Sequence, residues 1–334
     1  MSITKDMNED DLDLIIVVFS APGNFAKRKL VRETWATYLE QRPYRSKVKL
    51  VFLLGKTNKI DITRSISSEI TVHRDIIQMD MLDKYTRLTE KSVAFLRWVM
   101  TRAKSAKYVM KVDDDVFVNV PNLLRAFNET SRATKRFFLC HRIHNNPVVR
   151  DVNSKWYISK REFSADIYPD YCAGNGYTFS NDITEELFST AKSLPYFPME
   201  DVFVTGIVRL QINANLVGSE QFHSHAVPHP CLWRKIITYA EIPDKTFRSL
   251  WTEMHNTSLD CRTRPATKII DTKKVPESRY SWSLFVIVVL VIITCALALK
   301  FVSKLRCLAM MINTLRTLFD RRKHHVFGRN TTSV

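Results

Sequence analysis

The chain has 334 residues, 45% of them hydrophobic, which is enough to bury the core of one large domain and to leave an additional segment. Its formal net charge of +16 is concentrated near the end, where residues 268–334 carry twelve Lys or Arg against three Asp or Glu. With seven glycines and no Gly-rich phosphate loop, the sequence excludes P-loop and dinucleotide-binding proteins. Basic proteins often bind nucleic acid, but no nucleic-acid-binding motif is present, and we expect no such partner.

The first third of the chain alternates between strand-like and helix-like segments, which is typical of an α/β protein. Apolar runs of strand length end in turn residues, and longer amphipathic stretches follow them. The predicted elements are a strand at Leu12–Phe19, a helix at Phe25–Tyr38, a strand at Val48–Leu54 closed by Gly55, a short strand at Ile70–His73 and a helix at Leu88–Ala103.

Arg28 and Arg32 are four residues apart and therefore share one face of the first predicted helix. Two guanidinium groups near the carboxyl end of a strand suit a diphosphate or a nearby acidic site. The alternative is a solvated helix face. We favour a functional or site-supporting role.

Lys107–Asn122, KYVMKVDDDVFVNVPN, is an apolar run that leads into Asp113, Asp114 and Asp115 and then becomes apolar again. This pattern predicts a buried strand with an acidic end. Adjacent carboxylates repel one another, so a cation is needed where they are partly buried. Mn²⁺ and Mg²⁺ prefer such oxygen ligands. The alternative is a solvated acidic turn.

Residues 121–165 predict a helix and then a polar surface connection that contains His141 and His144. Gly174 and Gly176 precede a predicted strand at 177–180. They mark a place where the backbone turns tightly or approaches another group closely. Glu200 and Asp201 then follow a proline turn. This acidic pair is either a helix N-terminal pair or a catalytic pair.

Five segments resemble the inverting beta-1,3-glycosyltransferases of the galactosyltransferase family, and together they cover residues 12–251. They are RKLVRETW at 28–35, DKYTRLTEKSVAFLRW at 83–98, KVDDDVFVN at 111–119, YPDYCAGNGYTFS at 168–180 and FPMEDVFVTGI at 197–207. The resemblance implies the GT-A nucleotide-sugar transferase fold, in which helices flank a mainly parallel central sheet.

The resemblance also assigns roles within these motifs. Asp201 matches the aspartate proposed as the catalytic base, with Glu200 as its supporting neighbour. Donor-binding positions are Arg28, Arg32, Asp83, Lys111, Asp113, Asp114, Gly174 and Gly176, and the metal ligands are Asp115 and Asp113, joined by His223 or His225 of a fringe-like F-H-S-H segment. Two positions depart from the family: Arg87 stands where Asn is usual, and Tyr239-Ala240 lies where related members carry a histidine.

The implied function is transfer of a hexose, most simply galactose, from a UDP-sugar to the 3-hydroxyl of an acceptor glycan on a glycoprotein or glycolipid, with Mn²⁺ or Mg²⁺ as cofactor. A second interpretation is a catalytically inactive, membrane-bound glycan-binding protein with the same fold. A third is a basic tail-anchored protein at the cytosolic leaflet.

The apolar run in 283–299 predicts a transmembrane helix at 282–302. The expected organisation is a catalytic domain at 1–265, a basic linker at 266–281, this single span, and a basic tail at 303–334. Basic residues after the span place the tail in the cytosol and the catalytic domain in a lumen. We expect this lumen to be that of the Golgi. The family carries an N-terminal signal-anchor instead, and we expect the N-terminus of this sequence to be incomplete.

Cysteines and glycosylation sequons agree with a lumenal domain. Cys140, Cys172, Cys231 and Cys261 are an even number, compatible with two disulfides, and their spacing does not choose among three pairings. Asn128-Glu-Thr and Asn256-Thr-Ser are potential N-glycan acceptors.

Overall fold

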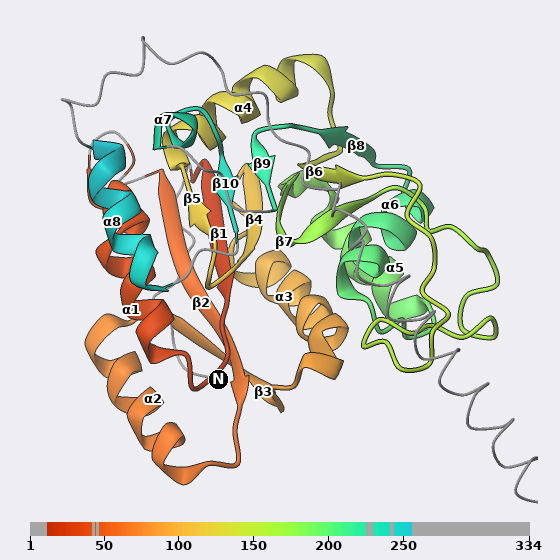
Figure 1. The fold of residues 1–334 in the computed structure, drawn as a ribbon, viewed down its shortest axis with the longest axis horizontal. Coiled ribbons are helices and arrows are strands. Elements are labelled where there is room, and N and C mark those ends of the chain that lie inside the picture. The colour runs from red at the N-terminus through yellow and green to blue at the C-terminus, as the bar shows by residue number, and fades with distance from the viewer. Residues whose placement is uncertain (1–11, 42–43, 45–46, 225–229, 241–243, 256–334) are drawn as a thin grey trace, which may run out of the picture. The chain divides into compact units, whose positions relative to one another are not determined.

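The computed structural model describes residues 12–41, 44, 47–224, 230–240 and 244–255. A seven-stranded mixed sheet lies at its centre, with the strand order β3-β2-β1-β4-β7-β6-β8 (Figure 1). The first four of these strands are mutually parallel, β7 is antiparallel to both β4 and β6, and β8 is parallel to β6. Their bounds are β1 Leu14–Phe19, β2 Val48–Lys56, β3 Ile76–Leu82, β4 Tyr108–Asp113, β6 Phe137–Ile143, β7 Tyr171–Ser180 and β8 Asn215–Gly218.

A second, three-stranded sheet has the order β5-β10-β9, with β5 Phe117–Val118, β9 Phe222–His223 and β10 Thr238–Tyr239. Its first strand, β5, follows the acidic segment at the end of β4 in the sequence. Because β10 pairs with both β5 and β9, it places residues 222–223 two strands away from residues 117–118.

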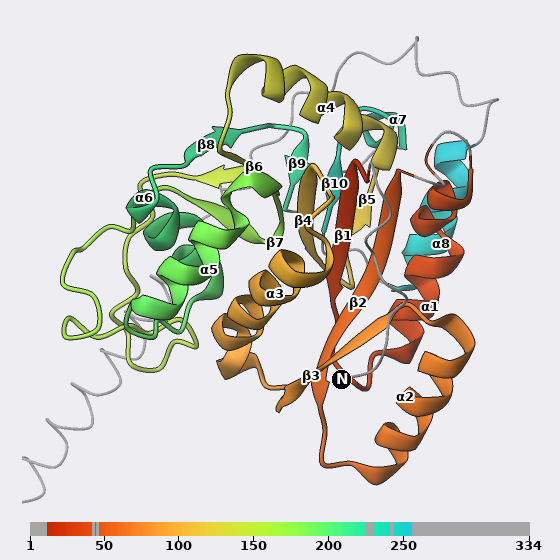
Figure 2. The same cartoon turned by 180° about the vertical axis from the view of Figure 1, so that it is seen from behind.

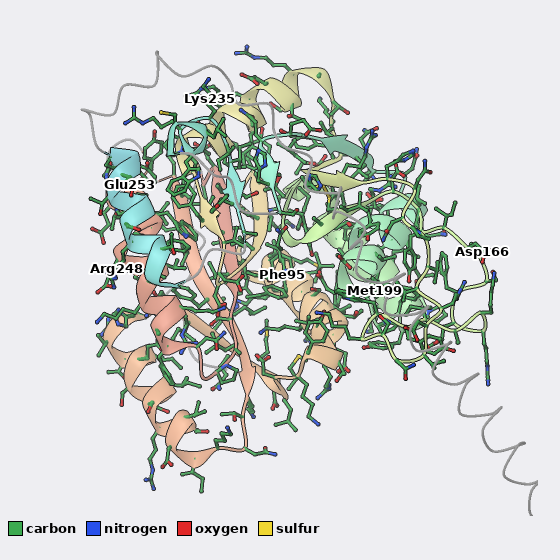
Figure 3. The ribbon with its side chains drawn as sticks, viewed as in Figure 1. Phe95, Asp166, Met199, Lys235, Arg248 and Glu253 are labelled. Atoms are coloured by element: carbon green, nitrogen blue, oxygen red, sulfur yellow. A yellow bond between two sulfur atoms is a disulfide. The ribbon has the colours of Figure 1, made fainter. Side chains whose placement is uncertain are left out.

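Every residue of β1 is buried, and alternate side chains serve the two faces of the large sheet. Ile15, Val17 and Phe19 join a cluster with helices α3 and α5, in which the Phe95 ring meets Phe19 edge-on at 5.5 Å (Figure 3). The intervening residues join a cluster with α1, α2, α4 and α8. Figures 1 and 2 show α3 and α5 on one side of the sheet and α1 and α8 on the other.

The helices and short helical turns have the following bounds: α1 Phe25–Glu33, η1 Trp35–Glu40, α2 Ile60–His73, η3 Tyr85–Arg87, α3 Leu88–Arg102, α4 Val120–Ala133, η4 Asn181–Ile183, α5 Thr184–Ser193, η5 Val202–Val208, α6 Arg209–Gln211, α7 Pro230–Trp233 and α8 Asp244–His255. The element η5 is a π-helix, and η1, η3 and η4 are 3-10 helices. The start of α4 follows from its sequence, since the Asn119 side chain accepts a hydrogen bond from the Asn122 backbone N–H and a proline occupies the first turn.

The predicted strand at Ile70–His73 is wrong, because these residues form the last turn of α2. Their β-branched side chains favour a strand locally, but Ile62, Ile66 and Ile70 recur every four residues and pack as one helical face on the core. The third strand is instead β3. The first predicted helix is also shorter than expected, since α1 ends at Glu33 and a 3-10 helix continues to Glu40.

Three further expectations need correction. Gly55 does not close β2 but lies inside it, where the register with β3 shifts. His141 belongs to β6, a strand within the predicted surface connection. Gly174 and Gly176 do not form a turn, because both lie in β7 and no described glycine has positive φ.

A disulfide joins Cys140 of β6 to Cys172 of β7, 32 residues apart, and Cys231 is also disulfide-bonded. The structure thus settles one of the pairings that the spacing left open. Among the described helices, none combines the length and the apolar character needed to span a membrane. The predicted span at 282–302, with its linker and tail, lies outside the described residues.

Candidate active site

The acidic segment lies at the carboxyl end of β4, where Asp113 pairs in register with Phe19 at the end of β1. The buried Lys111 donates a 2.7 Å hydrogen bond to Asp113 Oδ1 and another to the Gly174 carbonyl. Enclosure raises the pKa of Asp113 to about 6, although Lys111 opposes the rise, and the neighbouring Asp115 adds to it. The predicted buried strand with an acidic end is therefore confirmed.

The end of the loop after β1 and the first turn of α1 contact the other two carboxylates. Asn24 Nδ2 donates to Asp114 Oδ2 at 2.9 Å, and Lys27 Nζ lies 2.9 Å from Asp115 Oδ2 and 3.6 Å from Asp114 Oδ1. Burial raises the pKa of Asp114, whose residue is only 6% exposed. The alternative of a solvated acidic turn is wrong for Asp114, whereas the Asp115 side chain is 44% exposed.

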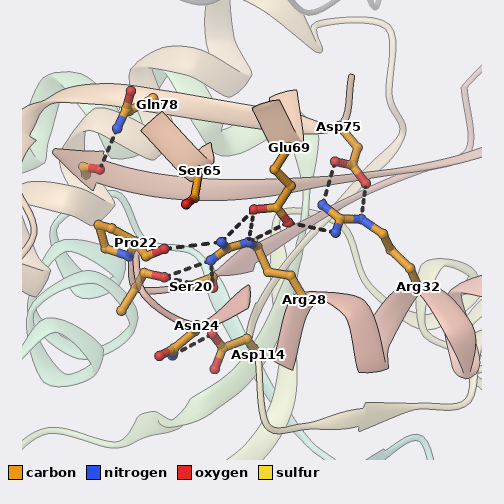
Figure 4. A network of polar contacts seen from close by, with 12 residues as sticks. Ser20, Pro22, Asn24, Arg28, Arg32, Ser65, Glu69, Asp75, Gln78 and Asp114 are labelled. Carbon is orange, nitrogen blue, oxygen red and sulfur yellow. Dashed lines mark hydrogen bonds and ion pairs between the residues drawn. The ribbon is translucent and has the colours of Figure 1, made fainter. Parts of the chain in front are cut away.

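Arg28 and Arg32 form hydrogen bonds and ion pairs with other groups of the protein (Figure 4). Arg28 is fully buried and donates to Glu69 of α2 at 2.7 Å, to Ser20 Oγ at 3.0 Å and to the Ala21 carbonyl at 2.8 Å. Arg32 donates to Glu69 at 2.7 Å and makes two bonds to Asp75. These bonds hold the loop after β1, which ends at Asn24, against α1 and α2.

Glu69 is a member of this network that the sequence did not reveal. Burial acts to raise its pKa, but hydrogen bonds from Arg28 and Arg32 outweigh that effect and lower the pKa below its usual value. Glu69 lies about one helical turn after Ile66 on α2. Its position beside α1 could have been predicted only if residues 60–73 had been predicted to form a helix.

A Glu69→Gln variant is expected to lose about 3 kcal/mol of unfolding free energy, because it leaves the buried Arg28 without its counter-charge. Urea unfolding measures the change. The matched control is Glu186→Gln, whose partner Arg136 is 36% exposed, and it is expected to lose less than about 1 kcal/mol. Equal losses in the two variants would contradict the assignment of Arg28 and Glu69 as a stabilising buried ion pair.

Asp83 lies just after β3, and its carboxylate is already bound within the protein. Its Oδ2 accepts hydrogen bonds from the Gly55 backbone N–H at 2.7 Å and from Lys91 Nζ at 2.8 Å. Lys91 also donates to the Ser20 carbonyl at 3.0 Å, and burial lowers its pKa although Asp83 opposes that change. Lys91 therefore joins the ends of β1, β2 and β3, a role that its place on an apolar helix face did not reveal.

Glu200 is buried and holds a fixed position. Its Oε1 accepts hydrogen bonds from Ser92 Oγ and Tyr177 OH, both at 2.7 Å, and its Oε2 lies 3.9 Å from Lys111 Nζ. Burial, followed by the Glu200 charge, raises the pKa of Tyr177 well above its usual value. This phenol therefore remains a proton donor to the carboxylate.

Asp201 borders an open cavity of about 470 Å³ that Lys111, Asp113 and Gly174 also line. Its Oδ1 accepts a hydrogen bond from the Val202 backbone N–H at 2.9 Å, at the start of the π-helix η5. Desolvation raises its pKa to about 6, and the adjacent Glu200 charge contributes. Such a carboxylate is ionised near neutral pH and is basic enough to accept a proton.

Gly174 lies close to Asp201, because a Cβ there would be 3.0 Å from Asp201 Oδ2 and would require that side chain to shift. The expected close approach is thus found at Gly174. At Gly176 a Cβ would meet its nearest neighbour, Val112 Cγ2, at 3.5 Å, an ordinary van der Waals contact.

The carboxylates at the end of β4 fit a hard divalent cation. Asp113 and Asp115 each bind an ammonium group through one oxygen, and their other oxygens have no hydrogen-bond partner among the described residues. No group of three or more His, Cys, Asp or Glu side chains in the described ranges is placed to hold a metal. Two carboxylates completed by substrate phosphates are a common arrangement for Mg²⁺.

The two candidate histidines differ in what the structure says of them. His223 is half-buried in β9, pairs in register with Tyr239, and has a pKa lowered by burial and by the nearby His141. It belongs to the small sheet whose strand β5 begins two residues after Asp115, and among the described residues no hydrogen bond or ion pair joins it to the acidic segment. His225 lies outside the described residues.

Comparisons of the sequence with a protein-family model and with known proteins point to the same family. A protein-family model described as "Galactosyltransferase" matches residues 26–219. Human "Beta-1,3-galactosyltransferase 5" is 36% identical over 251 residues, covering 73% of this chain and 78% of that protein. Mouse "Beta-1,3-galactosyltransferase 1" is 31% identical over 244 residues, covering 72% of this chain and 73% of that protein.

A solved structure of a glycosyltransferase involved in glycosylation of the major capsid of PBCV-1 aligns with 72% of this chain and 98% of its own. The TM-score is 0.42 and the sequence identity 11%, a likeness too weak to carry an argument.

Proposed function

Because this chain belongs to the beta-1,3-galactosyltransferase family, we propose that it is an inverting hexosyltransferase that uses a UDP-sugar. The transferred sugar is a hexose, with galactose as the leading candidate. The acceptor is the 3-hydroxyl of a glycan on a glycoprotein or glycolipid. The observation that carries the proposal is the Asp201 carboxylate, which borders the cavity, whereas the adjacent Glu200 is buried and its Oε1 accepts two internal hydrogen bonds.

In this reaction Asp201 takes the proton of the attacking acceptor hydroxyl. The hydroxyl oxygen forms the new bond to the anomeric carbon from the face opposite the nucleotide, so the configuration inverts. The bond from the anomeric carbon to the phosphate oxygen breaks, and its electron pair leaves with UDP. Glu200 holds Lys111 and Tyr177 in place around this site.

Donor binding uses the carboxyl ends of β1, β3 and β4. Asp115 and Asp113 would hold Mn²⁺ or Mg²⁺, which when bound supplies positive charge against the diphosphate. Asp83, Lys111 and Asp114 are proposed to support the donor through the contacts described above, and Arg28 and Arg32 support it by fixing the loop after β1.

The decisive experiment offers the full chain a panel of UDP-sugars, with Mn²⁺ and a mixture of β-linked glycosides, and measures UDP release and product linkage. UDP release with a single hexose donor and a β-1,3 product is expected. If glycosides bind but no UDP-sugar is turned over, the enzyme assignment fails.

That second outcome corresponds to a catalytically inactive glycan-binding protein, which one observation favours. Tyr239 and Ala240, where related members carry a histidine, are buried in the hydrophobic cluster, and the Tyr239 ring packs 5.5 Å from that of Trp233. This position therefore supplies packing in place of a ligand.

We also propose a lumenal, Golgi-membrane setting. The disulfide between Cys140 and Cys172 suits an oxidising compartment, and the acceptor residue of the first sequon, Asn128, is exposed on α4. The second sequon and the predicted membrane span lie outside the described residues.

The pH dependence of transfer tests whether a cavity carboxyl group with a pKa of about 6 must be ionised, which applies to Asp201 and also to Asp113. With a pKa of about 6, the Asp201 carboxyl becomes protonated as the pH falls through that value and can no longer accept a proton. Below about pH 6, kcat/KM is therefore expected to decrease by up to about tenfold per pH unit. Circular dichroism at each pH serves as the control for folding. A rate that stays constant down to about pH 4.5 would exclude a base with this pKa.

A further inference from the structure

Aromatic side chains gather at the cavity that Asp201 borders. Four aromatic residues in the described part of the chain are largely exposed, and three of them, Tyr85, Trp156 and Tyr157, line this cavity. Their exposures are 64%, 47% and 38%. Large aromatic groups usually lose such exposure on folding, so this concentration at one cavity indicates a binding surface.

The aromatic surface is built from two distant segments. Tyr85 belongs to η3, whereas Trp156 and Tyr157 belong to the long connection between β6 and β7. The Lys155 ammonium group lies 4.3 Å from the centre of the Trp156 ring and 6.0 Å from that of Tyr85, and so links the segments through cation–π contacts.

The connection that carries Trp156 is held by its own hydrogen bonds. The Arg150 guanidinium donates to the carbonyls of Ile158, Phe163 and Ala165 at 2.6–2.8 Å. Ile158, two residues after Trp156, is only 1% exposed and anchors the segment in the core. The exposed rings therefore stand on a fixed backbone, which lowers the entropy cost of binding.

We propose that Tyr85, Trp156 and Tyr157 bind the acceptor glycan by stacking against the apolar C–H face of a pyranose ring. The inference rests on the proposed function and specifies its acceptor site. The electron-rich ring faces that attract the Lys155 ammonium also attract the polarised C–H groups of a sugar. The hydroxyl groups at the edge of the same sugar remain free to reach polar groups in the cavity.

The cavity's composition assigns these rings to the acceptor and not to the donor. Asp201 lines it, together with Lys111, Asp113 and Gly174, whereas Asn24, Lys27 and Asp114 of the proposed donor side do not. An attacking hydroxyl must reach the base, whereas the nucleotide belongs with the loop after β1.

The test uses the full chain with the changes Trp156→Ala and Trp156→Phe. Methyl β-galactoside and methyl β-N-acetylglucosaminide serve as probes. The matched control is Val152→Ala, which changes a 71% exposed apolar residue of the same connection that does not line the cavity. Steady-state kinetics give separate KM values for glycoside and UDP-sugar, and saturation-transfer NMR detects glycoside binding without turnover.

Trp156→Ala should raise the glycoside KM by about tenfold and change the UDP-sugar KM by less than about twofold. Phe should restore the glycoside KM to within about threefold of the unmodified protein, and Val152→Ala should match it. An unchanged glycoside KM, or a rise only in the UDP-sugar KM, would overturn the inference. Failure of the proposed function is distinguished by NMR, because glycoside saturation transfer lost in Trp156→Ala supports the aromatic site even if no UDP is released. Saturation transfer that persists in that variant refutes it.

Discussion

Replacing Asp201 by Asn is expected to lower transfer by roughly 10²–10⁴-fold, the usual contribution of a general base. The amide is nearly isosteric with the carboxyl, and its oxygen can still accept the hydrogen bond from the Val202 backbone N–H, 2.9 Å away. It cannot accept a proton from the acceptor hydroxyl. UDP-sugar affinity should change little, because the proposed donor contacts lie at the ends of β1, β3 and β4.

Glu200→Gln is the comparison for this variant. A glutamine oxygen can still accept the 2.7 Å hydrogen bonds from Ser92 and Tyr177, so a smaller loss of turnover is expected. Initial rates at saturating donor and the dissociation constant of the UDP-sugar separate catalysis from binding. Full transfer activity in the Asp201 variant would place the base elsewhere, with Glu200 as the next candidate.

Asp115→Ala is expected to reduce Mn²⁺-dependent turnover by about 10³-fold or more, because it removes a principal carboxylate from the proposed cation site. The fold should persist, since the Asp115 side chain is 44% exposed and pairs with the partly exposed Lys27. After the change, Lys27 can move toward Asp114, from which its ammonium is separated by 3.6 Å.

Mn²⁺ titration of the UDP-release rate measures this effect, with thermal unfolding as the check on folding. Asp80→Ala is the matched control, because that carboxylate is 92% exposed and pairs with Lys56 away from the candidate site. Unchanged Mn²⁺-dependent UDP release in Asp115→Ala would exclude the metal-site assignment.

Elements whose apolar pattern agrees with their final environment could be predicted from the amino-acid sequence. β1, β4 and α3 are buried along continuous or helically spaced apolar residues, and the structure places them where the pattern predicts. The motif resemblance likewise identified the family, because five segments in order specify a chain far more tightly than any one of them.

Contacts between polar side chains, in contrast, could be identified only from the three-dimensional structure. Glu69 and Arg28 are 41 residues apart, and Glu200 and Ser92 are 108 apart, so no local pattern links them. The fold buries Arg28 against the loop after β1, gives the adjacent Glu200 and Asp201 different hydrogen-bond partners, and brings Gly174 against Asp201. It also overrode the β-branched residues 70–72, since packing Ile62, Ile66 and Ile70 on the core stabilises a helix more than local preference favours a strand. Side-chain contacts across the sheet depend on long-range register, and register is fixed only when the whole core packs.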